Sequence, residues 1–159
     1  MADFSVKMNG VDELAKKLEG LKYDMAKKGG RFALRKAAQV VRDAARQGAR
    51  RVDDSATGRS IAANITEKWN GRLNRQTGDL GFRVGVSQGA VLPKKGEKPD
   101  EGASGPTPHW RLLEFGTEKM RARPFMVPAM ESSAQKATDT FISEFDRAID
   151  RALKRTGTT

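Results

Sequence analysis

The chain has 159 residues, of which 37% are hydrophobic and 31% charged, so we expect a single domain over 1–159 with a modest core and a large charged surface. The absence of cysteine excludes disulfides and cysteine-ligated zinc or iron–sulfur sites. The formal net charge of +10 favours an anionic partner such as nucleic acid, an acidic protein or a membrane surface.

The N-terminal part predicts a strand and then two helices. Apolar and polar residues alternate over 4–8, which is typical of a half-buried strand. Apolar residues spaced by three and four predict a short helix over 11–21 and a longer one over 23–51, weakened at Gly29-Gly30. The expected inner stripe of the longer helix is Met25, Phe32, Ala33, Ala37, Val40, Val41, Ala44 and Gly48.

A second face of the longer helix is basic and could bind phosphates without sequence preference. Its residues, which are candidate contacts to DNA or to a partner, are Lys28, Arg31, Arg35, Arg42 and Arg46. No helix-turn-helix, zinc finger or interleaved aromatic residue accompanies this stripe, so recognition of bases is not expected.

The middle of the chain predicts strands and a loop. Residues 61–69 and 80–86 alternate in polarity around a turn that contains Asn70-Gly71, which favours an antiparallel pair. Residues 88–109 are rich in proline and glycine and predict a mobile loop, part of which (94–105) we expect to order on docking. The candidate partner or DNA contacts in this loop are Lys94, Lys95 and Lys98.

The C-terminal part predicts a last strand at 110–113 and a long helix over 127–153, with a frayed end at 155–159. The elements together predict an α+β fold: an antiparallel sheet of three to four strands on which two N-terminal helices and the long C-terminal helix pack.

Residues 112–130, LLEFGTEKMRARPFMVPAM, predict a corner between the last strand and this helix. Gly116 permits a turn that a Cβ would resist, and Pro128 suits the first helical turn, where its missing N–H is not needed. We expect Phe115 and Phe125 to anchor the two sides of the turn in the core.

Two further features of this corner bear on function. Glu114 is expected to hold the turn, either by accepting backbone N–H bonds or by pairing with Arg121 or Arg123; direct contact with a partner is the alternative. The basic hook, residues 119–123, offers Lys119, Arg121 and Arg123 to a partner or to DNA.

Catalysis is not expected from this sequence. His109 is the only histidine, and no nucleophile-elbow motif accompanies it. Scattered carboxylates give no metal-ligand spacing, and no cofactor is predicted. No apolar run reaches the length of a signal peptide or membrane span, so we expect a soluble protein without membrane contact.

The order Leu113-Glu114-Phe115-Gly116-Thr117, then Arg123-Pro124-Phe125 and Pro128-Ala129 before a final helix, resembles the "gene product ten-like" family of long-tailed bacteriophages. These are small tail-completion or neck proteins. The resemblance implies a non-catalytic virion protein, assembled in the host cytoplasm as a hexameric or dodecameric ring at the head–tail junction. It would join the tail tube to head-completion or connector proteins and contact DNA only transiently in its lumen.

Three alternatives remain open from the sequence. Within the phage interpretation, the protein is either a tail terminator or a neck adaptor. The main rival is a basic protein that binds nucleic acid without sequence specificity. A toxin-like enzyme is the third.

Overall fold

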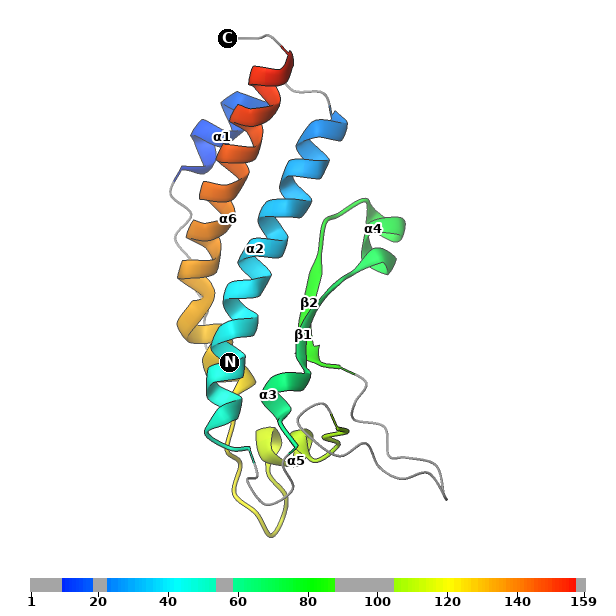
Figure 1. Cartoon of the computed structure of the whole chain (residues 1–159), viewed down its shortest axis with the longest axis vertical. Helices are drawn as coiled ribbons and strands as arrows, with labels where there is room; N and C mark the ends of the chain where they lie inside the picture. Colours follow the sequence, from blue (N-terminus) through cyan, green and yellow to red (C-terminus); the bar gives the residue numbers. More distant parts are fainter. Residues whose placement is uncertain (1–9, 19–22, 54–58, 88–104, 157–159) are drawn as a thin grey trace. The chain divides into compact units, whose positions relative to one another are not determined.

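The protein is a mixture of helix and strand, as the sequence predicts, in a computed structural model that describes residues 10–18, 23–53, 59–87 and 105–156 (Figure 1). The elements in chain order are α1 (Val11–Leu18), α2 (Tyr23–Arg50), α3 (Ile61–Asn64), β1 (Ile65–Trp69), α4 (Gly71–Thr77), β2 (Phe82–Val86), α5 (Trp110–Phe115) and α6 (Met126–Thr156). The predicted strand at 4–8 and the lysines at 94, 95 and 98 lie outside the described residues.

The chain divides into two compact units. The first comprises Met1–Val40, Lys68–Arg83 and Ser133–Thr159, and the second comprises Val41–Glu67 and Val84–Ser132. The elements α2, β1, β2 and α6 each contribute residues to both units. The single domain over 1–159 stays a prediction.

In the first unit, glycines allow α6 to approach α2 closely. A Cβ at Gly29 would lie 3.2 Å from the Cβ of Ala148, and one at Gly30 would lie 3.7 Å from Phe145. The helix α2 is continuous through these glycines, from Tyr23 to Arg50, and their missing side chains make room for a neighbouring helix. The expected weakening stays a prediction.

The first unit also contains the end of the β1–β2 hairpin, where Trp69 meets Phe82 edge-on at 5.3 Å between ring centroids. Asn70-Gly71, predicted as a plain turn, instead begins α4, because the Asn70 side chain accepts a hydrogen bond from the amide of Leu73. The helix ends at Gly78, whose φ of +80° is left-handed.

The described sheet has two antiparallel strands, β1 and β2, rather than three to four. Residues 61–64, predicted as strand, form α3 because the Ser60 hydroxyl caps the amide of Ala63 at 3.2 Å. Residues 110–113, also predicted as strand, belong to α5. Its apolar positions fit both the strand period and the helix period, because Trp110 and Leu113 are one helical turn apart.

The second unit has a core made mostly of small side chains. Its buried cluster is Ala45, Ala49, Ile61, Ala62, Ile65, Phe125 and Ala129. A Cβ at Gly48 would lie 3.2 Å from the Cβ of Phe125, so this ring packs directly against the backbone of α2.

The inner stripe of α2 is partly different from the predicted one. Ala33 and Ala37 are buried as expected, but Phe32 is 43% exposed and lies within reach of the cations of Lys36 and Arg151. Ala45 and Ala49 are fully buried in place of Ala44 and Gly48, which are half-buried.

The described end of the proline-rich segment packs into the second unit. The Asn64 amide donates hydrogen bonds to the Gly105 carbonyl at 2.9 Å and to the Thr107 hydroxyl at 3.1 Å, and both Asn64 and Thr107 are buried. Residues 88–104 lie outside the described residues.

Replacement of Asn64 by alanine should lower the free energy of unfolding by about 1–3 kcal/mol, because the buried Gly105 carbonyl loses its donor. Urea unfolding measures the change. Asn74→Ala is the control: its amide also donates to two carbonyls, but at exposed positions where water replaces it. Equal effects of the two substitutions would contradict this account.

Candidate functional site

The corner at 112–130 is held by the carboxylate of Glu114, which α5 places against the start of α6. Glu114 is 5% exposed and accepts hydrogen bonds from the amides of Phe125 at 2.7 Å, Met126 at 3.0 Å and Val127 at 3.0 Å. The first amides of a helix have no partner within the helix, and the helix dipole favours a negative charge there. Of the roles considered for Glu114, the structure shows the acceptance of backbone N–H bonds.

Gly116 ends α5 in a conformation that requires glycine. Its φ is +76° and its ψ is −178°, and its amide donates to the Leu112 carbonyl at 2.8 Å. A Cβ would lie 2.8 Å from the amide nitrogen of Ala122 and 2.9 Å from the carbonyl oxygen of Met120. The backbone of the basic hook therefore packs against the position where a side chain would stand.

The hook is fixed by its own hydrogen bonds. The amide of Thr117 donates to the Met120 carbonyl at 2.9 Å, and the Thr117 hydroxyl accepts from the amides of Lys119 and Met120. The amide of Arg123 then donates to the Leu113 carbonyl at 2.7 Å. The cationic side chains of the hook are exposed at Lys119, Arg121 and Arg123.

The two phenylalanines of the corner have opposite environments. Phe125 is 2% exposed, as predicted, whereas the prediction for Phe115 is wrong because its side chain is 73% exposed. Since 110–115 is helical, Phe115 lies one turn from the exposed Leu112 and not beside Leu113. Pro128 lies in the first turn of α6, and Pro124 precedes that helix.

Large apolar side chains are concentrated on the outside of this corner. We call the set the motif surface: Leu112, Phe115, Met120, Val127 and Met130, each at least 37% exposed. Elsewhere among the described residues, only Val11 and Phe32 are large apolar side chains with a similar exposed fraction. Exposed apolar side chains that gather into one patch mark sites of protein contact. The sequence pattern did not reveal this set of exposed side chains, because residues 110–113 fit a strand as well as a helix.

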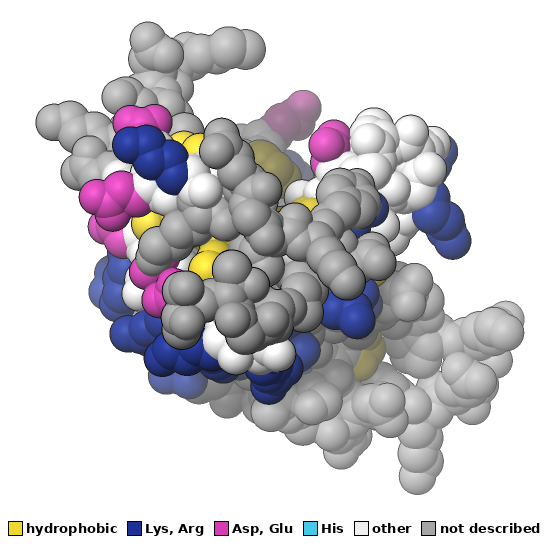
Figure 2. Space-filling view, turned by 90° about the horizontal axis from the view of Figure 1, so that it is seen from above, with side chains coloured by type: hydrophobic (Ala, Val, Ile, Leu, Met, Phe, Trp, Pro, Cys, Tyr) yellow, Lys and Arg dark blue, Asp and Glu magenta, His cyan; other side chains and the backbone are white. Residues whose placement is uncertain are grey.

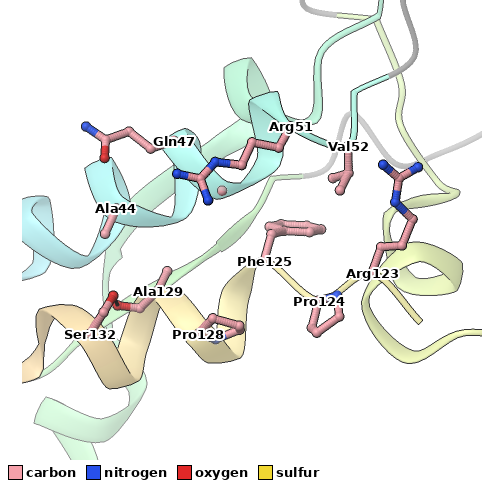
Figure 3. A pocket seen from close by; sticks show the side chains of 11 residues that line it. Ala44, Gln47, Arg51, Val52, Arg123, Pro124, Phe125, Pro128, Ala129 and Ser132 are labelled. Atoms are coloured by element: carbon pink, nitrogen blue, oxygen red, sulfur yellow. Dashed lines mark hydrogen bonds between the residues drawn. The ribbon is translucent and has the colours of Figure 1, made fainter. Parts of the chain in front are cut away.

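A pocket of about 290 Å³ is lined by residues of the corner (Figure 3). It lies between the end of α2 and the start of α6, within the second unit. Phe125 and the two prolines of the corner form apolar walls, and Arg51 and Arg123 lie on either side of the ring in this view. Arg51 was not among the predicted site residues, since nothing in its local sequence marks it.

The basic stripe of α2 is partly neutralised within the protein. The guanidinium of Arg42 lies 2.7 Å from carboxylates of both Glu67 and Asp43. Burial acts to lower the pKa of Arg42, but these hydrogen bonds outweigh it and raise that pKa above its ordinary value. Arg46 donates to the Ile65 carbonyl at 3.0 Å.

The other stripe residues belong to the first unit. The guanidinium carbon of Arg31 lies 4.2 Å from the ring centroid of Trp69, while the side chains of Lys28 and Arg35 are exposed. On the face drawn in Figure 2, described acidic side chains (magenta) lie next to basic ones (dark blue).

Groups suited to metal binding do not gather in the described parts of the chain. No set of three or more histidine, aspartate or glutamate residues there could hold a metal ion. His109 precedes α5, and its side chain makes no capping hydrogen bond. None of the described helices has the length and apolar character of a membrane span.

One comparison with known proteins gives a match. The model of the family described as "Bacteriophage HK97-gp10, putative tail-component" matches residues 12–116, more than half of the chain. No curated protein and no solved structure shows a significant match. The matched range covers most of α1 and extends through α5 to Gly116.

Glu114→Gln should lower the free energy of unfolding by about 1.5–3 kcal/mol, because an amide loses the negative charge and offers one acceptor oxygen to three N–H groups. Urea unfolding followed by circular dichroism measures this change. Glu118→Gln, an exposed site on the same turn, is the matched control and should change stability little. Equal stability of the two variants would contradict the capping role.

Gly116→Ala should also destabilise the protein, by roughly 1–3 kcal/mol for its backbone conformation alone. The close approach of Ala122 and Met120 adds to this cost. Gly85→Ala is the control, since a Cβ there meets no atom within 4 Å. If thermal unfolding shows similar midpoints for both variants, the requirement for glycine at Gly116 is wrong.

Proposed function

The chain belongs to the HK97-gp10-like family of bacteriophage tail components, and on that premise we propose that it is a structural protein of the head–tail junction. In this proposal it is a tail-completion or neck component that assembles as a hexameric or dodecameric ring. The ring joins the tail tube to head-completion or connector proteins and lets DNA pass. The protein assembles in the host cytoplasm and resides in the virion.

The motif surface is the observation that carries this proposal. Its five large apolar side chains are exposed, while the backbone beneath them is fixed by Glu114 and Gly116. Covering one such side chain fully contributes about 1.5–3 kcal/mol. A surface that is already rigid loses little conformational entropy when it binds, so most of that contribution remains available for association.

A ring requires that one surface of each subunit meets a different surface of the next one, and that the rotation closes. The motif surface supplies one of these two surfaces. We propose that a neighbouring copy covers the motif surface. Identical copies present the same surface at every subunit interface, so a few apolar contacts are repeated at each interface around the ring.

The nucleic-acid alternative has less support. Arg42 and Arg46 are engaged with Glu67, Asp43 and the Ile65 carbonyl, and so are not free to bind phosphates without breaking these contacts. We propose that contact with DNA is transient and non-specific, made by DNA passing through the ring. Such contacts weaken steeply as the salt concentration rises.

The double substitution Phe115→Ser/Val127→Ser tests the proposed assembly. Both side chains are exposed, so the subunit should fold with nearly unchanged stability. The contact between copies should weaken about 10²–10⁴-fold if both side chains are covered. Sedimentation and electron microscopy measure ring formation, and complementation of a phage lacking this gene measures the joining of heads to tails.

The matched control is Val11→Ser/Phe32→Ser, which removes the same residue types from exposed positions of the first unit. This control should form rings and complement the phage. Normal rings and normal virion yield from Phe115→Ser/Val127→Ser would refute the role of the motif surface. Tight DNA binding with a steep salt dependence and no rings would favour the nucleic-acid protein instead.

A further inference from the structure

One face of the β1–β2 hairpin carries two cations directly opposite each other. The amide of Asn70 donates to the Gly81 carbonyl at 2.8 Å, so these two residues are opposed across the antiparallel pair. Two positions further into each strand, Lys68 is opposed to Arg83 on the same face. Residues opposed in this way have Cα atoms about 5.5 Å apart.

Contacts on the other face of the hairpin show that Lys68 and Arg83 point away from α2. Their neighbours Trp69 and Phe82 pack edge-on, and the guanidinium carbon of Arg31 on α2 lies 4.2 Å from the centroid of the Trp69 ring. Because side chains alternate along a strand, Lys68 and Arg83 lie on the face that α2 does not cover. Both of their side chains are exposed.

The helix α4, which connects β1 to β2 (Figure 1), adds two arginines at the end of this face. A Cβ at Gly81 would lie 2.7 Å from Cδ2 of Leu73, so α4 packs on the face of the hairpin that carries Arg83. Arg72 and Arg75 are neighbours one turn apart on α4, and both are exposed. We call these four cations the hairpin surface: Lys68, Arg72, Arg75 and Arg83.

The described part of the chain does not engage the charges of the hairpin surface. None of the four side chains forms an ion pair or a hydrogen bond with a described residue. Asp79 is the only acid in residues 68–83, and it accepts a hydrogen bond from the Thr77 hydroxyl at 2.7 Å. Like charges directly opposite each other destabilise a hairpin. An anion outside the subunit would offset that repulsion, which indicates an anionic partner.

The composition of this surface favours a phosphodiester backbone over an acidic protein. No large apolar side chain in residues 68–83 is exposed, whereas protein interfaces have an apolar centre. Phosphate contacts need only cations and hydrogen-bond donors, and a DNA duplex presents one negative charge per about 1.7 Å of its axis. Two opposed cations about 5.5 Å apart, with two more on α4, can therefore contact several phosphates of one duplex.

We propose that the hairpin surface contacts the phosphodiester backbone of double-stranded DNA without sequence preference. Arg42 and Arg46 of the α2 stripe have partners within the subunit, so the hairpin and not that stripe supplies the principal contact. That the duplex is the phage genome passing through the ring rests on the proposed function; the capacity of the hairpin to bind phosphates does not.

The first test uses a short DNA duplex of mixed sequence as the probe of the full-length protein. The duplex should shift the NMR amide signals of residues 68–83, and log affinity should fall against log salt concentration with a slope of about −3 to −4. An oligoglutamate peptide of equal net charge should bind about tenfold more weakly, because its charges are more widely spaced. Equal binding of the peptide, or shifts only outside the hairpin, would overturn the proposal.

A double variant separates the hairpin surface from general positive charge. Lys68→Gln/Arg83→Gln should weaken DNA binding about 10–100-fold at about 0.1 M salt and reduce the salt slope by about two, one for each phosphate contact. Its urea midpoint should not fall, because the variant also removes the repulsion across the hairpin. The matched control is Lys136→Gln/Arg155→Gln, at exposed positions of α6 in the same unit, and it should keep the salt slope of the parent.

Two outcomes of this comparison would overturn the proposal. One is equal DNA affinity of the two variants. The other is parental DNA affinity of Lys68→Gln/Arg83→Gln together with self-association, because the cations would then protect the strand edges from pairing with other chains.

Ring formation and phage complementation distinguish the failure of this inference from that of the proposed function. If the parent forms rings and complements the phage while Lys68→Gln/Arg83→Gln binds DNA as the parent does, the inference fails and the proposed function stands. If the parent binds DNA through the hairpin surface but forms no ring and is dispensable for the virion, the proposed function fails and the hairpin surface stands.

Discussion

The second unit depends on one buried carboxylate. Glu114 satisfies the amides of Phe125, Met126 and Val127 and thereby fixes where α6 begins. A buried charge is costly unless it is fully hydrogen-bonded, and here three donors and the positive end of a long helix meet that requirement. The same bonds connect α5 to α6 across the hook, so this one interaction sets the geometry of the whole corner.

This capping arrangement leaves the outward-facing side chains of the corner without a structural role. With the first amides of α6 satisfied and Phe125 buried, the backbone of the corner needs no help from the side chains that face outwards. Leu112, Phe115 and Val127 can therefore be apolar without a role in folding. Their exposure is costly in water and useful only if something covers them, which is why we interpret them as a contact surface.

The sequence predicts the parts of this fold that depend on a long periodic pattern or on the backbone preference of a single residue. The helices α2 and α6 are each many turns long, so their period is unmistakable, and Gly116 and Pro128 follow from the conformations that single residues allow. Residues 61–64 and 110–115 are too short for the strand period and the helix period to be distinguished.

The candidate site was predictable only in part, because some of its residues are far apart in the chain. Glu114 lies eleven or more positions from the amides that it caps, but Gly116 and Pro124 between them mark a corner. Arg51 and Arg123 are far apart in the chain, and only the tertiary structure brings them to one pocket. A pair of this kind leaves no local signal in a single sequence.

The alanine-rich core of the second unit has a consequence for the life of the free subunit. Ala45, Ala49, Ala62 and Ala129 each remove little more than one methyl group from water, far less than leucine or phenylalanine would. Such side chains contribute less to stability than larger ones would, and a protein of low stability gains the most from ligands that bind only its folded form. The particle that incorporates this subunit would then also preserve it, so that unincorporated copies are the ones left to host proteases.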